Sequence, residues 1–243
     1  MEKKAAKRFY KQVSVAEENT GFTVMLDNRQ LKTPAVAPLI LPNESLAKAI
    51  CAEFDAQQEE IEPQTMPIFS LSATAIDRVM TQRKVLDDEL VRFGHNDLIS
   101  YRCSTDEDVD LASRQEKMWG AIQNWLADNY EISLMAFEGI MPKSQPEAVT
   151  TPMQKAVQSC DHWRYVALYR ATTLTGSLAL GLAFTSGHLT VADLMSHAFL
   201  DEIYQEEKWG VDEWALERRD AIMAELTDAF SYMALLDERH IVT

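Results

Sequence analysis

Asp193, His197 and Asp201 come nearest, by residue type and spacing, to a reactive site in this sequence. They follow one another at intervals of four, which places their side chains on one face of a helix. Two carboxylates and an imidazole on one face could hold a metal ion or transfer a proton. The same residue types are mostly exposed to solvent when they lie opposite an apolar stripe. We therefore expect a solvated helix face, and keep a small metal-dependent enzyme as the alternative.

The other histidines and cysteines show no spacing typical of a metal or redox site. The sequence contains no His-x-x-x-His pair and no Cys-x-x-Cys motif. Cys160 lies two residues before His162, but residues two apart on a helix point to different faces. The common dinucleotide, phosphate-binding and hydrolase motifs are also missing. The sequence thus predicts no enzyme activity, no cofactor and no metal.

The charge balance is strongly acidic. The chain carries 23 Lys and Arg against 38 Asp and Glu, a formal net charge of −15, and its sequence pI is about 4.7. Such a surface repels phosphate backbones, so we expect no nucleic-acid partner. The length of 243 residues is enough for one large domain or two modest ones.

Targeting and membrane signals are absent from the pattern. The charged N-terminal residues 1–8 lead into aromatic residues without the apolar stretch of a signal peptide. The longest uncharged run, residues 171–187, is shorter than the roughly 20 apolar residues of a spanning helix. The three cysteines are odd in number and far apart, which favours a reducing compartment. We expect no membrane insertion, and a bacterial cytoplasmic protein or a mature form in the mitochondrial matrix.

The first forty residues alternate between apolar and polar types as strands do, for example at Val13 and Val15 and at Val24 and Leu26. Short polar turns separate these runs. A helical period begins after Pro42. We therefore predict a small antiparallel β-rich N-terminal domain with one helix over residues 1–65.

The rest of the chain, residues 66–243, reads as a larger all-helical domain, so the predicted fold class is α+β. Apolar faces predict helices near 76–93, 118–126, 162–184, 190–209 and 212–235. Residues 97–110 read as a polar, acidic connection. Residues 139–152, which include Pro142 and Pro146, read as a loop or boundary. The helix over 162–184 is apolar nearly all round, which predicts the centre of the bundle. Gly176 and Gly181 within it would let a neighbouring backbone approach closely.

The helix over 190–209 opens with the capping box of Thr190 and Asp193 and ends before Gly210. The last helix has an apolar stripe at Ile222, Met223, Leu226 and Phe230, which predicts a docked C-terminal segment. Trp209 and Trp214 lie on either side of the break between these two helices, among several acidic residues. Either an interface anchor or plain packing would explain two tryptophans there.

Six segments, in this order, resemble the ATP-twelve-type chaperone family, which assists assembly of the catalytic head of F-type ATP synthase. The segments are Leu26-Asp27-Asn28-Arg29-Gln30-Leu31-Lys32-Thr33-Pro34, Glu53-Phe54-Asp55-Ala56-Gln57, Ile61-Glu62-Pro63-Gln64-Thr65-Met66-Pro67, Ala75-Ile76-Asp77-Arg78-Val79, Asp97-Leu98-Ile99-Ser100-Tyr101-Arg102 and Tyr204-Gln205-Glu206-Glu207-Lys208-Trp209-Gly210. Asn28 stands where the family usually has Gly, and Phe54 where it usually has Trp. Asn tolerates positive φ, and Phe keeps the apolar bulk of Trp but lacks its N–H.

The resemblance implies a β-rich N-terminal domain and a helical C-terminal domain. It also implies a client, the unassembled alpha subunit of F-type ATP synthase, and no cofactor. One functional hint carries over, an acidic residue just before Tyr204, which is Asp201 or Glu202. We predict that these three residues, with Gln205 and Trp209, bind the client and that the chaperone is a monomer. A scaffold with a different client stays as a further alternative.

Overall fold

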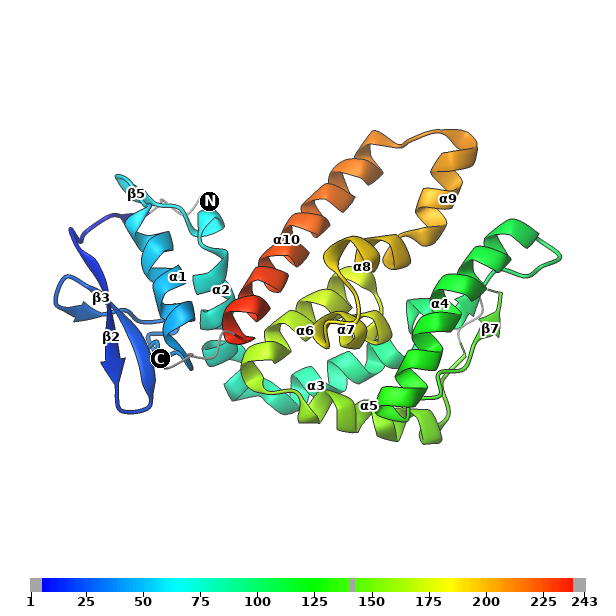
Figure 1. Cartoon of the computed structure of the whole chain (residues 1–243), viewed down its shortest axis with the longest axis horizontal. Helices are drawn as coiled ribbons and strands as arrows, with labels where there is room; N and C mark the ends of the chain where they lie inside the picture. The colour runs from blue at the N-terminus through cyan, green and yellow to red at the C-terminus, as the bar shows by residue number, and fades with distance from the viewer. Residues whose placement is uncertain (1–5, 140–142, 238–243) are drawn as a thin grey trace, which may run out of the picture. The chain divides into compact units, whose positions relative to one another are not determined.

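The computed structural model describes residues 6–139 and 143–237 of the chain (Figure 1). The described residues form two compact units, the first made of residues 6–83 and 228–237 and the second of the residues between them. The α+β class predicted from the sequence is confirmed, because the strands of the first unit precede a unit made almost wholly of helices. The compact units do not coincide with the ranges 1–65 and 66–243 expected from the sequence, since the first unit also takes in the helix after residue 65 and the end of the chain's last helix.

The sheet of the first unit is an antiparallel meander of β2 (Val13–Glu18), β3 (Gly21–Leu26) and β4 (Arg29–Gln30). A separate short pair joins β1 (Ala6–Lys7) to β5 (Glu60–Ile61). In the turn after β3 the positive φ of 53° belongs to Asp27, not to its neighbour Asn28. The Asp27 carboxylate also accepts hydrogen bonds from two backbone N–H groups that precede β2. The turn therefore does not need glycine at position 28.

Helix α1 (Glu44–Asp55) lies beside β2 and β3 (Figure 1). Asn43 caps it as predicted, because its side chain accepts a hydrogen bond of 2.9 Å from the N–H of Leu46. The same side chain donates to the carbonyl of Leu235, 2.9 Å away, near the end of α10 (Glu213–Asp237). Phe54 is buried and meets the Phe69 ring edge to face, with centroids 5.1 Å apart. Phenylalanine thus fills this position with apolar bulk alone.

The helix predicted near 76–93 is interrupted. Its range is covered by a π-helical turn at Ala75–Val79, which continues α2 (Pro67–Thr74), and by α3 (Met80–His95), with non-helical angles at Gln82. Glu53 of α1 accepts hydrogen bonds from the N–H groups of Ile68 and Phe69, at 2.7 and 2.8 Å. These bonds satisfy free donors at the start of α2 and attach it to α1. This contact explains why α2 belongs to the first unit.

Two of the six family-like segments meet in the first unit. The hydroxyl of Thr33 donates a hydrogen bond of 2.6 Å to Asp77, and the N–H of Ala35 donates to the other oxygen of the same carboxylate. Asp77 lies in the π-helical turn, 44 residues after Thr33. The carboxylate therefore fixes the loop after β4 to the region between α2 and α3.

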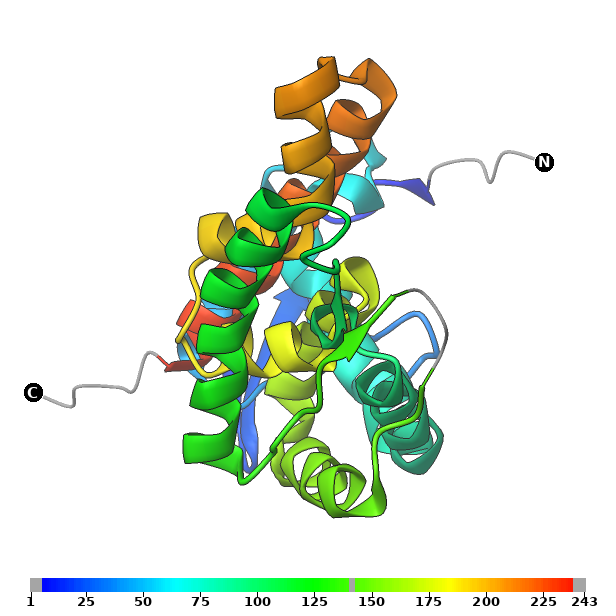
Figure 2. The same cartoon turned by 90° about the vertical axis from the view of Figure 1, so that its right-hand side faces the viewer.

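The second unit is built from helices in sequence order. After α3 come η3 (Leu98–Ser100), α4 (Val109–Tyr130), α5 (Glu147–Ser159), α6 (His162–Thr175), α7 (Leu178–Thr185), α8 (Val191–Ala198), α9 (Leu200–Trp209) and most of α10. A short parallel pair joins β6 (Tyr101–Arg102) to β7 (Phe137–Glu138). Helix α9 lies near one end of the long helix α4 in both views (Figures 1 and 2).

The buried centre of this unit is the pair α6 and α7. The sequence predicts one helix over 162–184, and this prediction is wrong in one respect, because Gly176 adopts a left-handed φ of 72° and ends α6. All eight residues of α7 are buried. A Cβ on Gly181 would lie 2.4 Å from the hydroxyl oxygen of Thr172. Gly181 therefore permits the close approach of α6 and α7 that the sequence suggested.

The connection after α3, which the sequence predicts to be polar and acidic, is buried at its start. Asp97 is fully buried and accepts hydrogen bonds from the hydroxyl of Ser177, at 2.5 Å, and from the N–H of Ala179, at 2.9 Å. Ser177 in turn accepts a hydrogen bond from the N–H of Leu180 as the cap of α7. Burial raises the pKa of Asp97 to about 6, against the opposing effect of these donors. Asp97 thus completes the start of the most buried helix.

Two further expectations need correction. The loop expected at 139–152 contains the start of α5, which begins at Glu147 and includes Pro152 in its second turn; residues 140–142 lie outside the described residues. In α10, Ile222 and Leu226 are buried, whereas Met223 and Phe230 are about half exposed. The predicted stripe therefore faces the interior only in part.

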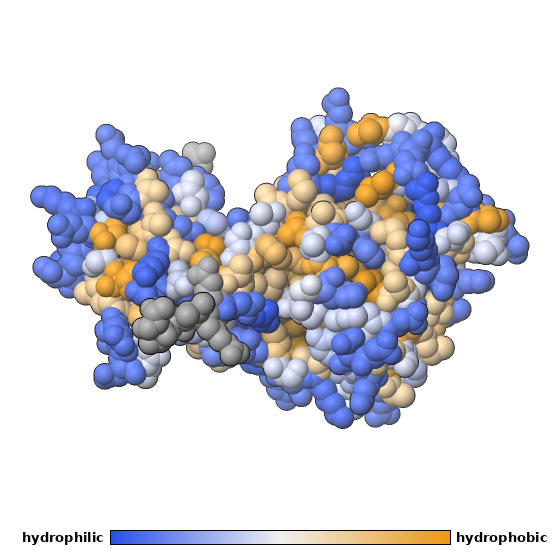
Figure 3. All heavy atoms as spheres, viewed as in Figure 1, coloured by the Kyte–Doolittle hydropathy of each residue, from blue (hydrophilic) through white to orange (hydrophobic). Residues whose placement is uncertain are grey.

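Hydrophilic residues make up much of the face of the chain shown in Figure 3, in agreement with the acidic composition. No helix among the described residues is long and apolar enough to cross a membrane.

Candidate functional site

The predicted site residues lie on α9, which is a separate helix. The sequence predicts one helix over 190–209, but Phe199, with φ −111° and ψ 21°, separates α8 from α9. The capping box of Thr190 and Asp193 at the start of α8 is confirmed. Because α9 is short and begins without a side-chain cap, contacts with α4 and α10 must hold it in place.

Tyr204 forms the first of these contacts. Its side chain is buried, and its hydroxyl donates a hydrogen bond of 2.6 Å to Asp108, the N-cap of α4. Lys208, one turn further along α9, lies 2.9 Å from the other oxygen of the same carboxylate. The Tyr204 hydroxyl first, and then Lys208, hold the pKa of Asp108 well below its usual range. Asp108 is therefore an anion that fastens α9 to the start of α4.

Two cations lie over the ring of Tyr204. The ammonium of Lys208 is 4.4 Å from the ring centroid, and the guanidinium carbon of Arg114 is 5.0 Å from it. Arg114 also forms an ion pair of 2.7 Å with Glu207. Cations over an aromatic face are attracted by the electron density of the ring. Tyr204 is thus held by its hydroxyl and by its ring.

Asp201 is partly buried and faces α4. Its carboxylate accepts a hydrogen bond of 2.8 Å from Gln115 of α4. Burial raises the pKa of Asp201, while Gln115 and the nearby charge of Arg102 oppose that rise. Arg102 is itself buried and lies 5.0 Å over the ring of Trp119. Asp201 therefore supplies part of the negative charge that a buried guanidinium requires.

Glu202 ties α9 to α10 and remains partly exposed. Arg218 approaches both of its carboxylate oxygens, at 2.6 and 2.7 Å, and Arg219 lies 3.4 Å away. Arg219 forms a second ion pair with Glu206, also on α9, at 2.7 Å. The Glu202 side chain keeps 41% of its surface accessible. Both acidic candidates are partly exposed, but the Asp201 carboxylate is engaged by Gln115 of α4, whereas Glu202 lies on the side of α9 that faces α10.

Gln205 and Trp209 are exposed on α9. The Trp209 side chain has 72% of its surface accessible, and Trp214, at the start of α10, has 81%. The sequence left open whether these tryptophans pack internally or anchor an interface. The structure shows that neither indole is packed into the protein.

The residues that could form a reactive site are not brought together. Asp193 is occupied as the partner of Thr190, and the imidazole Nδ1 of His197 lies 2.7 Å from the backbone carbonyl of Asp193. Asp201 lies beyond the helix break and bonds to Gln115. No group of three or more His, Cys, Asp and Glu residues within the described ranges could hold a metal ion. Cys160 follows the last residue of α5, and His162 begins α6 after its cap Asp161.

Sequence reasoning missed the partners of the site residues. Asp108 and Gln115 are 96 and 86 residues away from Tyr204 and Asp201, and no local pattern connects them. Asp108 lies in the segment that the sequence predicts as an acidic connection, and it caps α4. Arg218 and Arg219 are only 16 and 17 residues from Glu202, and a hairpin of two helices could have suggested their pairing.

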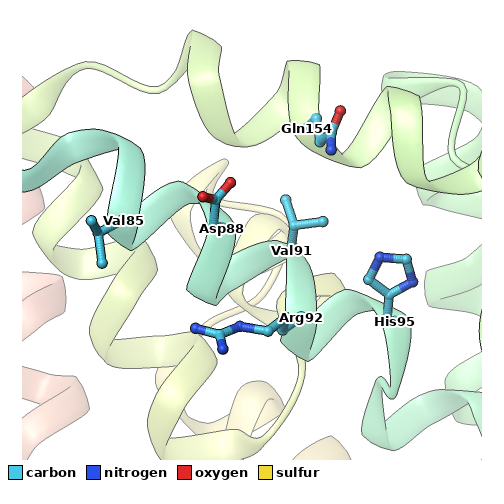
Figure 4. Close-up of a pocket in the computed structure, with 6 residues that line it drawn as sticks. All are labelled: Val85, Asp88, Val91, Arg92, His95 and Gln154. Atoms are coloured by element: carbon cyan, nitrogen blue, oxygen red, sulfur yellow. The ribbon is translucent and has the colours of Figure 1, made fainter.

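The second unit also has hollows away from these residues. One, of about 430 Å³, lies along α3 and is lined by Val85, Asp88, Val91, Arg92 and His95, with Gln154 on the facing helix α5 (Figure 4). A smaller one, of about 340 Å³, has Tyr130, Cys160 and Arg164 among its lining residues. Neither contains a residue of the predicted site.

Comparison with known proteins gives the class and then the family. Residues 7–127 match the family described as ATP12 chaperone protein. The crystal structure of Atp12 from Paracoccus denitrificans is 34% identical, with a TM-score of 0.89, and the match covers 95% of this chain and 98% of that one. Protein atp12, mitochondrial, from Schizosaccharomyces pombe is 24% identical over 214 residues, which are 84% of this chain and 74% of the yeast protein. Protein ATP12, mitochondrial, from Saccharomyces cerevisiae is 23% identical over 262 residues, covering 89% and 81%.

These matches define the protein as a chaperone. The chain belongs to the ATP12 chaperone family, which confirms the resemblance carried by its six sequence segments.

Proposed function

We propose that this chain binds the unassembled alpha subunit of F-type ATP synthase and promotes assembly of the catalytic head. The observation that carries the proposal is the match to the Paracoccus Atp12 structure over nearly the full length of both chains. A match of that extent includes the unit that carries α9 and its neighbours, where the predicted client-binding residues lie.

The physical task fits the surface of the chain. An unassembled subunit exposes apolar area that its neighbours later cover, and patches of more than a few hundred Å² promote aggregation. A chaperone must cover such area reversibly. The net charge of −15 favours a client with basic patches and opposes association of the chaperone with itself. It also disfavours nucleic acid, and we propose that the chaperone acts as a monomer.

The client-binding site that we propose divides the five predicted residues by role. Gln205, Trp209 and the accessible part of Glu202 contact the client directly, since they are exposed on α9. Tyr204 and Asp201 position the helix, because their polar groups bond to Asp108 and Gln115 of α4. A client cation that reached Glu202 would compete with Arg218, so binding at this point would exchange one ion pair for another.

We further propose that the chaperone works without bond chemistry and without nucleotide, since the sequence has no phosphate-binding loop. Its two yeast relatives are named as mitochondrial proteins. For this chain we propose the bacterial cytoplasm, or the mitochondrial matrix if it is the mature form of a eukaryotic protein.

The test is aggregation of isolated alpha subunit, followed by light scattering with and without this chain. We expect protection at near-equal molar amounts in the absence of ATP, and no protection of an unrelated aggregation-prone enzyme. Equal protection of both proteins would indicate a general holding activity and contradict the proposed client. A strict requirement for ATP would contradict the nucleotide-free mechanism.

A further inference from the structure

The turn between α9 and α10 presents three apolar side chains to solvent, which we call the indole tip: Trp209, Val211 and Trp214. Their exposed fractions are 72%, 62% and 81%. The turn has defined ends, because Gly210, with a φ of 96°, ends α9 and Asp212 accepts a hydrogen bond of 3.0 Å from the N–H of Trp214 at the start of α10. The indoles are therefore presented by a built turn between two helices.

Two nearly uncovered tryptophans, one on each side of a short turn, are unusual for a packed protein. Tryptophan is highly buried on average, because each indole has a large apolar area that water solvates poorly. It is also among the residues most enriched at the energetic centres of protein interfaces. The ion pairs from Glu202 and Glu206 to Arg218 and Arg219 hold the two helices together behind the tip. The tip is thus both apolar and firmly supported.

The charge beside the tip is negative, and the basic residues of the described chain do not neutralise all of it. Lys208, Arg218 and Arg219, the basic residues next to it, are paired with Asp108, Glu202 and Glu206. Glu213 and Glu217, in the first turns of α10, are exposed, and no ion pair joins either of them to a basic residue of the described chain. A partner would therefore meet indoles bordered by free carboxylates.

We propose that the indole tip docks a segment of the client that presents apolar side chains flanked by Lys or Arg. This inference rests on the proposed function and specifies the chemistry of the client segment. The apolar side chains would cover the indoles, and the basic flanks would pair with Glu213 and Glu217. The tip extends the proposed client-binding site from α9 on to the start of α10.

Charge argues against the other occupants of such a surface. An anionic membrane or a nucleic acid would be repelled by the carboxylates at the tip. A second copy of the chain would bring two acidic tips together, which like charges oppose. A basic, apolar peptide segment satisfies both properties of the surface at once.

The test uses the full chain and two dye-labelled amphipathic peptides of equal length, one of Leu and Lys and one of Leu and Glu. Fluorescence anisotropy gives their dissociation constants. We expect the Lys peptide to bind at least about tenfold more tightly than the Glu peptide, with an advantage that shrinks in high salt. Equal binding of the two peptides overturns the proposed charge selection.

Matched variants assign the binding to the tip. The pair Trp209→Ser and Trp214→Ser, and separately the pair Glu213→Lys and Glu217→Lys, should each weaken the Lys peptide by about tenfold or more. Val85→Ser, which removes an apolar side chain that is 63% exposed on α3, and the pair Glu17→Lys and Glu18→Lys on β2 should leave its affinity unchanged. Circular dichroism and urea unfolding confirm that each variant is folded. An equal loss in the tip and control variants overturns the inference.

Two further outcomes separate this inference from the proposed function. If the tryptophan variant still protects the alpha subunit fully, the tip is not the docking surface, although the proposed client stands. If the native chain fails to protect the alpha subunit, the proposed function fails whatever the peptides show. A dimer of the native chain in sedimentation that the tryptophan substitutions abolish assigns the tip to self-association and overturns the inference.

Discussion

The hydroxyl of Tyr204 donates a hydrogen bond of 2.6 Å to Asp108, a residue 96 positions earlier in the chain. That bond makes a residue of the proposed client site a structural tie between α9 and the N-terminus of α4. The proposed site therefore depends on the stability of the second unit, so client binding and stability must be measured separately.

Tyr204→Phe keeps the ring and removes the hydroxyl. Because the lost hydrogen bond has a charged acceptor and a buried donor, we expect the free energy of unfolding to fall by about 1.5 kcal/mol or more. Urea unfolding followed by circular dichroism measures the change. Gln205→Ala, at an exposed neighbour, is the control and should change stability by less than about 0.5 kcal/mol. Equal stability of the tyrosine variant and the control would contradict the structural role.

Asp201→Ala and Glu202→Ala should differ in stability. Loss of Asp201 leaves Gln115 without its partner and reduces the negative charge near buried Arg102, so we expect a loss of about 2 kcal/mol or more. Glu202 forms a partly exposed ion pair, and its removal should cost less than about 1 kcal/mol. Urea unfolding of the two variants provides the comparison. If both variants unfold at the same urea concentration as the native chain, the contacts of Asp201 with Gln115 and Arg102 do not stabilise the fold.

The pH dependence of stability should contain a contribution from Glu53. Burial raises its pKa from 4.5 to about 7, against the lowering effect of the N–H groups of Phe69 and Ile68. A raised pKa in the folded state means that the folded state binds the proton more tightly than the unfolded state. This contribution is therefore fully present below about pH 4.5 and is lost as the pH rises through about 7.

Glu53→Gln removes that titration while it keeps the size of the side chain. We expect the difference in free energy of unfolding between the native chain and this variant to change with pH between about 4.5 and 7. The native chain should become less stable relative to the variant as the pH rises. Urea unfolding at several pH values gives the difference directly. A difference that is constant across this range would show that Glu53 titrates normally.

Gly181→Ala and Gly120→Ala should have opposite effects. A Cβ on Gly181 would lie 2.4 Å from the Thr172 hydroxyl in the crowded contact of α6 and α7, and we expect a loss of about 1 to 3 kcal/mol. A Cβ on Gly120 in α4 would meet only the side chain of Glu116, which is 77% exposed and forms a long ion pair of 3.9 Å with Arg102, so this flexible side chain can shift. There the better helix propensity of alanine should raise stability by up to about 1 kcal/mol. Thermal unfolding of both variants measures the contrast, and a shared direction would contradict the packing argument.

The elements that follow local rules could be predicted from the sequence. The alternation around Val24 predicts the meander, Asn43 predicts the start of α1, and Thr190 with Asp193 predicts the start of α8. These signals act within a few residues, because a cap or a pleat is a local arrangement. The two main helix breaks were missed for a related reason, since Gly176 and Phe199 interrupt an apolar period that continues on both sides.

The side-chain partners could not be predicted, because they come from distant positions. In the sequence, Asp97 is only one more polar residue of a connection. Its role becomes visible only in the structure, where it lies against the start of α7. Asp201 and Glu202 are equivalent in the sequence, and only the positions of Gln115 on α4 and Arg218 on α10 distinguish them. Exposure of Trp209 was likewise open, because tryptophan suits both a core and an interface.

The hydrogen bond from Asn43 to Leu235 joins residues 192 positions apart, and it has a consequence for the order of events during synthesis. The first unit needs the end of α10, whereas the second unit is one continuous stretch of the chain. A ribosome completes that stretch before it delivers the last helical turns to the first unit. Because domains generally fold as units while the chain emerges, the helical unit can be finished while the first unit, although made earlier, still lacks its C-terminal piece. Premature termination within α10 would therefore harm the N-terminal sheet and its helix more than the helices that precede the stop.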